Sequence, residues 1–388
     1  MPRSDGFRPR FTFPLCIITC TLLAGSLSAP ALFAGAFANA FAVEVLDFTD
    51  LQNPKGEASA KPDRPRLFKR FRQEDPQQKL PQTRGRPLSI KVHVPEGDGP
   101  WPVVIVSHGA GGNRDTHFAQ AQDLARHGYG VLCLEHPGSN TERMKSSIRI
   151  FRNLKQMIHD PAELLGRPKD VAFAVDQAAE WNRSHPRLRG RLDLTRVAVM
   201  GHSFGAYTVL VVSGARPAAP AEADAKEPGQ SLGPDLFDAR IKCGIALSPQ
   251  GPGDPFFLKE SYSTIRIPVL GISGTRDKQQ NGDAPLARLE SFKLWPANKG
   301  QNAFLWLTNA GHLDFTDSSS ASGESGRGLP SANRADVQKV VRAASLMFLK
   351  ECLKPVAEKG PSDISTLSAS ALRPSLGGTV NHFELLRK

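Results

Sequence analysis

The pentapeptide Gly201-His202-Ser203-Phe204-Gly205 combines residue types whose spacing suits covalent catalysis. A serine between two glycines fits the pattern G-x-S-x-G, in which a sharp turn between a strand and a helix presents the serine hydroxyl at the edge of a sheet. An apolar β-branched stretch, 196–200, precedes it, and an apolar stretch of helical composition, 205–214, follows. The pattern therefore predicts Ser203 as a nucleophile on a strand-to-helix turn.

A base must accompany this serine, because a hydroxyl does not attack at neutral pH unless a neighbouring group takes its proton. In strand–turn–helix enzymes the chain order is serine, acid, histidine. Two histidines follow Ser203, namely His312 and His382. His312 comes a short turn after an apolar stretch, 303–307, whereas His382 lies in a tail of irregular composition. We therefore expect His312 to be the base.

The acid that orients the base should lie on a loop after a late strand. Asp277 comes four residues after the stretch 265–273, which has the composition of a strand. Asp254 follows an earlier strand through a longer Gly/Pro loop, and Asp283 lies deeper in the loop of Asp277. Asp277 is the first candidate for the acid, and Asp254 and Asp283 remain the alternatives.

Acyl transfer also needs donors for the oxyanion that forms on the substrate. One is predicted to be the backbone N–H of Phe204, directly after the nucleophile. The other should come from the loop after an early strand, where His108-Gly109-Ala110-Gly111-Gly112 is rich in glycine. We expect the N–H of Ala110 to be this second donor, and His108 to brace the loop.

The segments around these residues alternate between strand and helix patterns. Predicted strands are 88–94, 102–107, 130–135, 196–200, 241–247, 265–273 and 303–307, and predicted helices are 116–127, 170–181, 205–214 and 335–353. Several of the strands are continuously apolar, as strands buried on both faces are. This alternation predicts an α/β protein with a mainly parallel, twisted sheet and helices on both faces.

The N-terminal 40 residues have the features of a secretory signal peptide. Arg3, Arg8 and Arg10 precede an uncharged stretch, 11–38, and Ala38-Asn39-Ala40 has the small-x-small pattern of a cleavage site. We therefore expect cleavage after Ala40 and a secreted or periplasmic protein, with an uncleaved membrane anchor as the alternative.

The rest of the chain divides by composition into one large domain and two flanks. Residues 41–86 are expected to be an irregular, basic lead-in, 87–354 the catalytic domain and 355–388 an irregular tail. Two stretches within the domain, 216–239 and 316–334, are low in apolar residues and are expected to be surface excursions, the first of them a candidate lid. The formal net charge is +11. The basic residues of 55–86 contribute to it and are interpreted as a solvated arm, with weak contact to an anionic surface as the alternative.

Several classes of protein are excluded by what the composition lacks. There are five cysteines and no pair with zinc-knuckle spacing, and neither H-E-x-x-H nor closely spaced His/Asp ligands occur. The loop 108–112 lacks the lysine of a phosphate-binding loop. No metal, no cofactor and no nucleic-acid partner is therefore expected. Cys133, Cys243 and Cys352 each lie in apolar stretches and are expected to be free thiols, with a Cys243–Cys352 bridge as the alternative.

Taken together, these motifs resemble the α/β-hydrolase superfamily, and within it proteins similar to bacterial dienelactone hydrolases and platelet-activating factor acetylhydrolases. The segments that carry the resemblance are 107–112, 136–140, 167–171, 201–208, 274–277 and 311–312. The resemblance implies an α/β-hydrolase fold and a cofactor-free hydrolase of a small-molecule or lipid-like ester. It also implies a triad of Ser203, Asp277 and His312.

Two departures set limits on what the resemblance implies. Dienelactone hydrolases have a cysteine where this chain has Ser203. In the acetylhydrolases the acid follows an earlier strand, at a place that here reads Ala246-Leu247-Ser248-Pro249. Amide hydrolysis or perhydrolysis by the same triad, and a non-catalytic binding module on the same fold, are the alternative functions.

Overall fold

The computed structural model describes a single unit within Ala40–Lys388. The described residues are 40–53, 86–219, 231–253, 255–278, 284–298, 301–317, 333–355, 367–376, 380 and 382–388. The predicted signal peptide apart from Ala40 and the basic segment apart from Arg86 lie outside these ranges, as do residues 220–230 and 318–332 of the two predicted excursions. None of the described helices is both long enough and apolar enough to cross a membrane.

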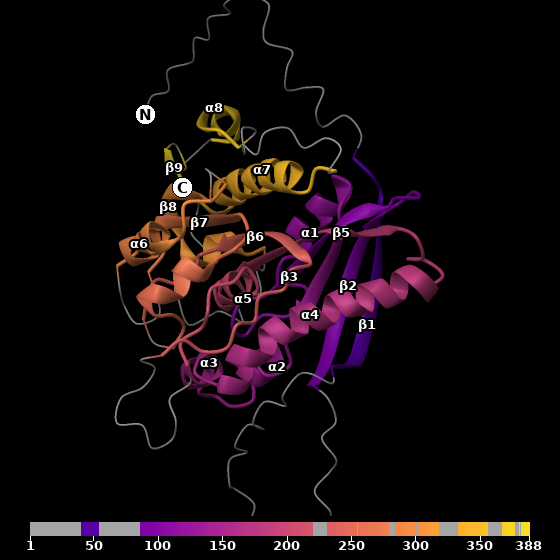
Figure 1. The fold of residues 1–388 in the computed structure, drawn as a ribbon, viewed down its shortest axis with the longest axis horizontal. Helices are drawn as coiled ribbons and strands as arrows, with labels where there is room; N and C mark the ends of the chain where they lie inside the picture. Colours follow the sequence, from indigo (N-terminus) through magenta and orange to yellow (C-terminus); the bar gives the residue numbers. More distant parts are fainter. Residues whose placement is uncertain are drawn as a thin grey trace, which may run out of the picture. The chain divides into compact units, whose positions relative to one another are not determined.

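The strands of the described residues form one mixed sheet in the order β1-β2-β4-β3-β5-β6-β7-β8-β9 (Figure 1). Their bounds are β1 (Val43–Asn53), β2 (Arg86–Pro95), β3 (Trp101–Ser107), β4 (Gly130–Glu135), β5 (Leu192–His202), β6 (Ile241–Leu247), β7 (Val269–Arg276), β8 (Ala303–Gly311) and β9 (Phe383–Arg387). From β4 through β3 to β8 neighbouring strands are parallel, and the pairs β1–β2, β2–β4 and β8–β9 are antiparallel. The mainly parallel sheet is as predicted.

Helices lie on both faces of this sheet, so the molecule has three layers (Figure 1). They are α1 (Phe118–Arg126), α2 (Thr141–Met144), α3 (Ile150–Ile158), α4 (Pro161–Ser184), α5 (Phe204–Val212), α6 (Leu286–Leu294), α7 (Arg334–Cys352) and α8 (Ala369–Leu372), with 3-10 turns η1 (Lys259–Thr264), η2 (His312–Phe315) and η4 (Arg373–Ser375). Successive side chains of a strand point to opposite faces. Val103 and Ile105 of β3 accordingly pack with α4 and α5, whereas Val104 and Val106 pack with α1 and α7.

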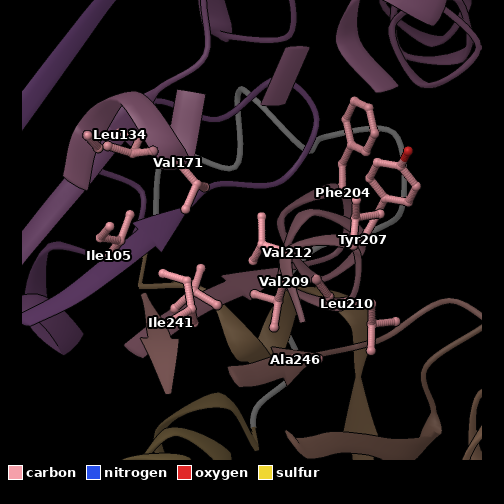
Figure 2. Close-up of a cluster of buried hydrophobic side chains, with 14 of the residues drawn as sticks. Ile105, Leu134, Val171, Phe204, Tyr207, Val209, Leu210, Val212, Ile241 and Ala246 are labelled. Atoms are coloured by element: carbon pink, nitrogen blue, oxygen red, sulfur yellow. The ribbon is translucent and has the colours of Figure 1, made fainter. Parts of the chain in front are cut away.

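Helix α5, which follows the predicted nucleophile, is buried along its whole length. Its residues are mostly apolar and are buried on every side, which is the pattern of a helix enclosed by other elements. Figure 2 shows Val209 and Val212 of α5 gathered in one cluster with Ile241 of β6 and Val171 of α4. The buried helix therefore gives the preceding turn a rigid support.

Two flanking segments that we expected to be irregular contain regular structure. Within 41–86, β1 pairs antiparallel with β2 along its length. Within 355–388, α8 is helical and β9 pairs antiparallel with β8. These expectations were wrong because edge strands obtain their hydrogen bonds from a neighbour that is distant in sequence, so local composition shows little of the pairing.

Helix α4 is longer than predicted, because it begins at Pro161 rather than near residue 170. The Asp160 side chain caps its start by accepting a hydrogen bond from Ala162 N–H, 2.9 Å. Pro168 lies inside the helix, where a proline leaves the carbonyl four residues earlier without its usual donor. The Tyr207 hydroxyl donates to that carbonyl, on Leu164, at 3.0 Å. A tertiary contact from α5 therefore compensates for the proline.

The three cysteines of the described region, Cys133, Cys243 and Cys352, are free thiols. Cys133 and Cys243 are buried in the core. Burial raises the pKa of Cys133 well above its usual value, which keeps this thiol protonated.

Candidate active site

Ser203 occupies a strained turn between β5 and α5. Its backbone has φ 56° and ψ −116°, a conformation that a residue with a side chain rarely adopts. A Cβ on Gly205 would lie 1.9 Å from the Ser107 carbonyl oxygen, and one on Gly201 would lie 2.5 Å from the Gly205 carbonyl oxygen. Both glycines are therefore needed for α5 to start this close to β3, which is why the turn can present the serine at the end of β5.

The structure brings the three predicted catalytic residues into contact. His312 Nε2 lies 2.9 Å from Ser203 Oγ, and His312 Nδ1 lies 2.8 Å from Asp277 Oδ1. Asp277 follows β7 and His312 begins η2 after β8, so both reach the same sheet edge as Ser203. Ser203 and His312 retain 4% and 7% of their surface exposed, while Asp277 is fully buried. With a proton on Nδ1 donated to Asp277, Nε2 is free to accept the serine proton.

Among the alternatives that the sequence left open, His382 lies in the described part of the chain. Asp254 and Asp283 lie outside the described ranges. His382 is exposed, and its carbonyl accepts a hydrogen bond from Thr308 N–H, 3.1 Å. Asp314, which is close to His312 in sequence, accepts a hydrogen bond from Gly311 N–H at 2.8 Å and so fixes the turn before the histidine.

Asp277 is held ionised although it is buried. Burial by itself would raise the pKa of this carboxyl, but Arg288 and His312 hold it well below its usual value. Arg288 Nε lies 3.1 Å from Oδ1, and the Ser273 hydroxyl donates to Oδ2 at 2.8 Å. Arg288 is itself buried, and its pKa is lowered because of that burial. Sequence reasoning missed Arg288, since nothing in its own segment distinguishes it from a surface arginine.

Ser248 is a second unpredicted member of the site. It follows β6 with φ 59°, and its Oγ lies 2.8 Å from His312 Nδ1, the same nitrogen that contacts Asp277. Arg288 Nη1 donates to the Ser248 carbonyl at 2.9 Å. The loops after β6 and β7 therefore converge on one face of the histidine.

The two predicted oxyanion donors lie in the expected elements. Ala110 is buried in the loop after β3, which is held by hydrogen bonds from Gly111 N–H to the Ser139 carbonyl, 2.8 Å, and from Gly112 N–H to the Gly109 carbonyl, 3.1 Å. Phe204 is the first residue of α5. The N–H groups of a first helical turn have no partner within the helix, and they favour negative charge.

Gln250 supports the nucleophile turn from the loop after β6. Its side-chain Nε2 donates to the Ser203 carbonyl at 2.6 Å, and the backbone carbonyl of Gln250 accepts from the Tyr262 hydroxyl at 2.8 Å. Both side chains are buried. These contacts join η1 to the nucleophile turn, and no sequence motif indicated them.

No cluster of three or more His, Cys, Asp or Glu side chains in the described region is arranged to hold a metal ion. The Asp277 carboxylate is already occupied by His312 and Arg288. A serine–histidine–acid site does its chemistry with these side chains and backbone donors. That the protein works without a metal or cofactor stays a prediction.

Two known protein families match the sequence of this chain. The family described as alpha/beta hydrolase fold matches residues 102–218, and the family described as platelet-activating factor acetylhydrolase, isoform II, matches residues 165–368, which is more than half of the chain. The chain belongs to the platelet-activating factor acetylhydrolase, isoform II, family. The acetylhydrolase branch of the predicted resemblance is therefore confirmed, together with the α/β-hydrolase fold.

Curated proteins similar to this acetylhydrolase-family chain match it over part of their own length. The platelet-activating factor acetylhydrolase of Bos taurus is 27% identical over 222 residues, 49% of this chain and 43% of the relative. That of Cavia porcellus is 24% identical over 285 residues, 65% of this chain and 58% of the relative. The chain thus spans about half the length of these curated relatives. A ferulic acid esterase from Streptomyces cinnamoneus is similar in fold, with a TM-score of 0.50, 19% identity and coverage of 86% of this chain and 96% of the esterase.

Proposed function

We propose that this protein is a serine hydrolase that cleaves a carboxylic ester through an acyl-enzyme. The observation that carries the proposal is the pair of hydrogen bonds from His312, one to Ser203 Oγ and one to Asp277 Oδ1, at a strained strand-to-helix turn. The relatives named acetylhydrolases support the same reaction class.

The geometry supports a specific order of proton and bond transfers. Ser203 Oγ attacks the ester carbonyl while its proton passes to His312 Nε2, and Asp277 stabilises the imidazolium. The negative charge that forms on the carbonyl oxygen is stabilised by the N–H groups of Phe204 and Ala110. His312 then protonates the leaving alcohol, and a water molecule releases the acyl group from Ser203 by the same steps.

The substrate is proposed at the level of a chemical class. The name of the relatives points to acetyl esters of a lipid-like alcohol as the first compounds to test, and small-molecule esters belong to the same class. The proposed setting is outside the cytoplasm, because the sequence of residues 1–40 has the features of a signal peptide.

The test is hydrolysis of a p-nitrophenyl ester series from acetate to palmitate by the full chain and by Ser203→Ala. We expect Ser203→Ala to lower kcat by about 10⁶-fold, because the nucleophile is lost. Ser213→Ala is the matched control, since Ser213 lies just past the other end of α5 and its buried Oγ has no hydrogen-bond partner among the described residues. An anilide measured alongside separates ester from amide hydrolysis. Turnover that survives Ser203→Ala would refute the proposal.

A further inference from the structure

A buried cluster of charged side chains lies behind the predicted oxyanion loop. Helix α4 carries Glu163, Arg167 and Asp170, spaced four and three residues apart, so they share one face of the helix. All three are fully buried, as is Arg86 of β2. Two cations and two anions thus face each other in the interior. Buried charges are tolerated when they are paired and hydrogen-bonded.

Arg86 neutralises both carboxylates. Its Nη2 donates to Glu163 Oε2 at 2.8 Å, its Nη1 also contacts Glu163, and its Nε donates to Asp170 Oδ2 at 2.9 Å. Glu163 Oε2 additionally accepts from the Ser139 hydroxyl at 2.6 Å. The guanidinium of Arg167 points instead to neutral acceptors on three other elements.

Ser107, His136 and Asp170 in this cluster have the spacing of a second serine–histidine–acid set. His136 Nε2 lies 2.9 Å from Ser107 Oγ, and His136 Nδ1 lies 2.8 Å from Asp170 Oδ2. All three are fully buried, and Arg167 Nη2 also donates to Ser107 Oγ, 3.1 Å. Burial, with the charges of Arg167 and Arg86, keeps the pKa of His136 well below its usual value. This set therefore holds the end of β3 in place, where no substrate reaches it.

Arg167 contacts both halves of the predicted oxyanion hole. Its Nη2 donates to the carbonyl of His108, at the start of the loop that carries Ala110. Its guanidinium carbon lies 4.4 Å from the centre of the Phe204 ring, a cation–π contact with the residue that supplies the other donor. Its Nε donates to Thr208 Oγ1 on α5 at 3.2 Å.

A single rigid group thus spans the loop after β3 and the start of α5. A guanidinium is planar and donates in fixed directions, so it sets the geometry of its partners more strictly than an ammonium does. Its Nη1 is in turn held by Ser139 Oγ, 2.7 Å, and through that hydroxyl by Glu163. The buried cluster therefore fixes Arg167, and Arg167 fixes the two chain segments.

We propose that Arg167 is a positioning residue that sets the separation between the N–H of Ala110 and the N–H of Phe204. The inference rests on the proposed ester hydrolysis, because these donors act only on a developing oxyanion. Displacement of catalytic groups by about 1 Å can cost about 10²-fold in rate. Loss of Arg167 should therefore impair transition-state stabilisation while leaving the contacts of Ser203, His312 and Asp277 in place.

The test compares an ester with its thiono counterpart, in which sulfur replaces the carbonyl oxygen. A sulfur anion is larger and accepts hydrogen bonds weakly, so the thionoester benefits less from correctly spaced donors. We expect Arg167→Lys and Arg167→Met to lower kcat/KM for the oxygen ester by about 10- to 100-fold, mostly through kcat, and for the thionoester much less. The oxygen-to-thiono ratio of kcat/KM should fall accordingly.

Arg240→Met is the matched control, because Arg240 also contacts α4, through Asp176 and the Ala172 carbonyl, and its third partner in the described region is Asp238 rather than a residue of the site. Its ratio should equal that of the unmodified chain.

If Arg167→Met does not fold, Thr208→Val removes one acceptor of the guanidinium at nearly constant volume and should lower the ratio by a smaller amount. Equal losses on both esters in the Arg167 variants would overturn the positioning role and leave ester hydrolysis intact. An unmodified chain that neither hydrolyses esters nor reacts with a serine-directed phosphonate would overturn both proposals.

Discussion

His312 receives support on its Nδ1 side from two neighbouring loops. Asp277 and Ser248 both lie 2.8 Å from this nitrogen, and they follow the adjacent parallel strands β7 and β6. Only Asp277 brings a charge, and Arg288 contacts both residues. At the scale of residues, the site thus has two places from which an acid can reach the histidine, and one of them is occupied by a serine.

Moving the acid between these places is a direct test. Asp277→Ala should lower kcat/KM by about 10⁴-fold, because no negative charge then stabilises the imidazolium. It should also cost about 3–5 kcal/mol of stability, because Arg288 loses its buried carboxylate. Adding Ser248→Asp should recover at least about tenfold in rate, since the new carboxylate enters the vacated space beside His312 Nδ1, and a β6-loop residue at positive φ tolerates aspartate. Kinetics and urea unfolding measure the two effects.

Ser273→Asp in the Asp277→Ala background is the control for that experiment. Ser273 contacts Asp277 Oδ2, so an acid there also restores a charge near Arg288. The Ser273 side chain contacts the acid rather than the histidine, so stability should improve without a gain in rate. Equal activity of the two double variants would contradict the assignment of Nδ1 as the point of support.

The nucleophile turn depends on how closely α5 approaches β3. The carbonyl of Ser107 lies where a Cβ on Gly205 would have to be. Neither atom could rotate away, because the backbone fixes the position of each. At the scale of elements, the strand and the helix can therefore meet only through glycine.

Gly205→Ala should accordingly destabilise the protein by more than about 3 kcal/mol and abolish esterase activity, because relief of the clash requires β3 and α5 to separate. Gly190→Ala is the comparison. A Cβ there meets no atom within 4 Å, and only its φ of 74° disfavours alanine, so about 1 kcal/mol is expected. Thermal unfolding of both variants measures the difference, and similar losses would show that the approach of α5 to β3 is not the limiting constraint.

The whole molecule contains several histidines that are buried in neutral form. Burial lowers the pKa of His93 to about 4 and those of His108 and His136 well below the usual value. In the unfolded chain these groups bind a proton near pH 6.5. Below that pH the unfolded state therefore binds protons that the folded state does not bind. The contribution of these histidines to the free energy of unfolding is fully present above pH 6.5 and decreases as the pH falls.

The free energy of unfolding should decrease by about 1.4 kcal/mol per pH unit for each such histidine between about pH 6 and pH 5. His93→Gln should reduce this slope by about 1.4 kcal/mol per pH unit, because one buried neutral histidine is removed. His93 lies on β2, apart from the triad, so the substitution leaves the site residues in place. Urea unfolding at several pH values measures the slope, and a flat profile would contradict the buried neutral assignment.

Local sequence determined much of the fold and the identity of the predicted site residues. Apolar strand patterns identified the parallel strands, and the glycines around Ser203 identified the turn, because both constraints act between near neighbours in the chain. The order serine, acid, histidine then selected Asp277 and His312, and the structure places both in contact with their expected partners. Their catalytic roles remain predictions for the experiments above.

Only the tertiary structure decided which distant groups support that site. Arg288 lies in a segment without a motif of its own, and the patterns noted around Arg167 and Ser248 did not indicate a supporting role for either residue. The contacts of all three come from strands and helices that converge at one sheet edge. The edge strands β1 and β9 were missed for the same reason, since their hydrogen bonds come from partners far along the chain. The pattern of residues near a side chain predicts the helix or strand to which it belongs. Its contacts with distant segments depend on tertiary packing, which a single sequence does not show.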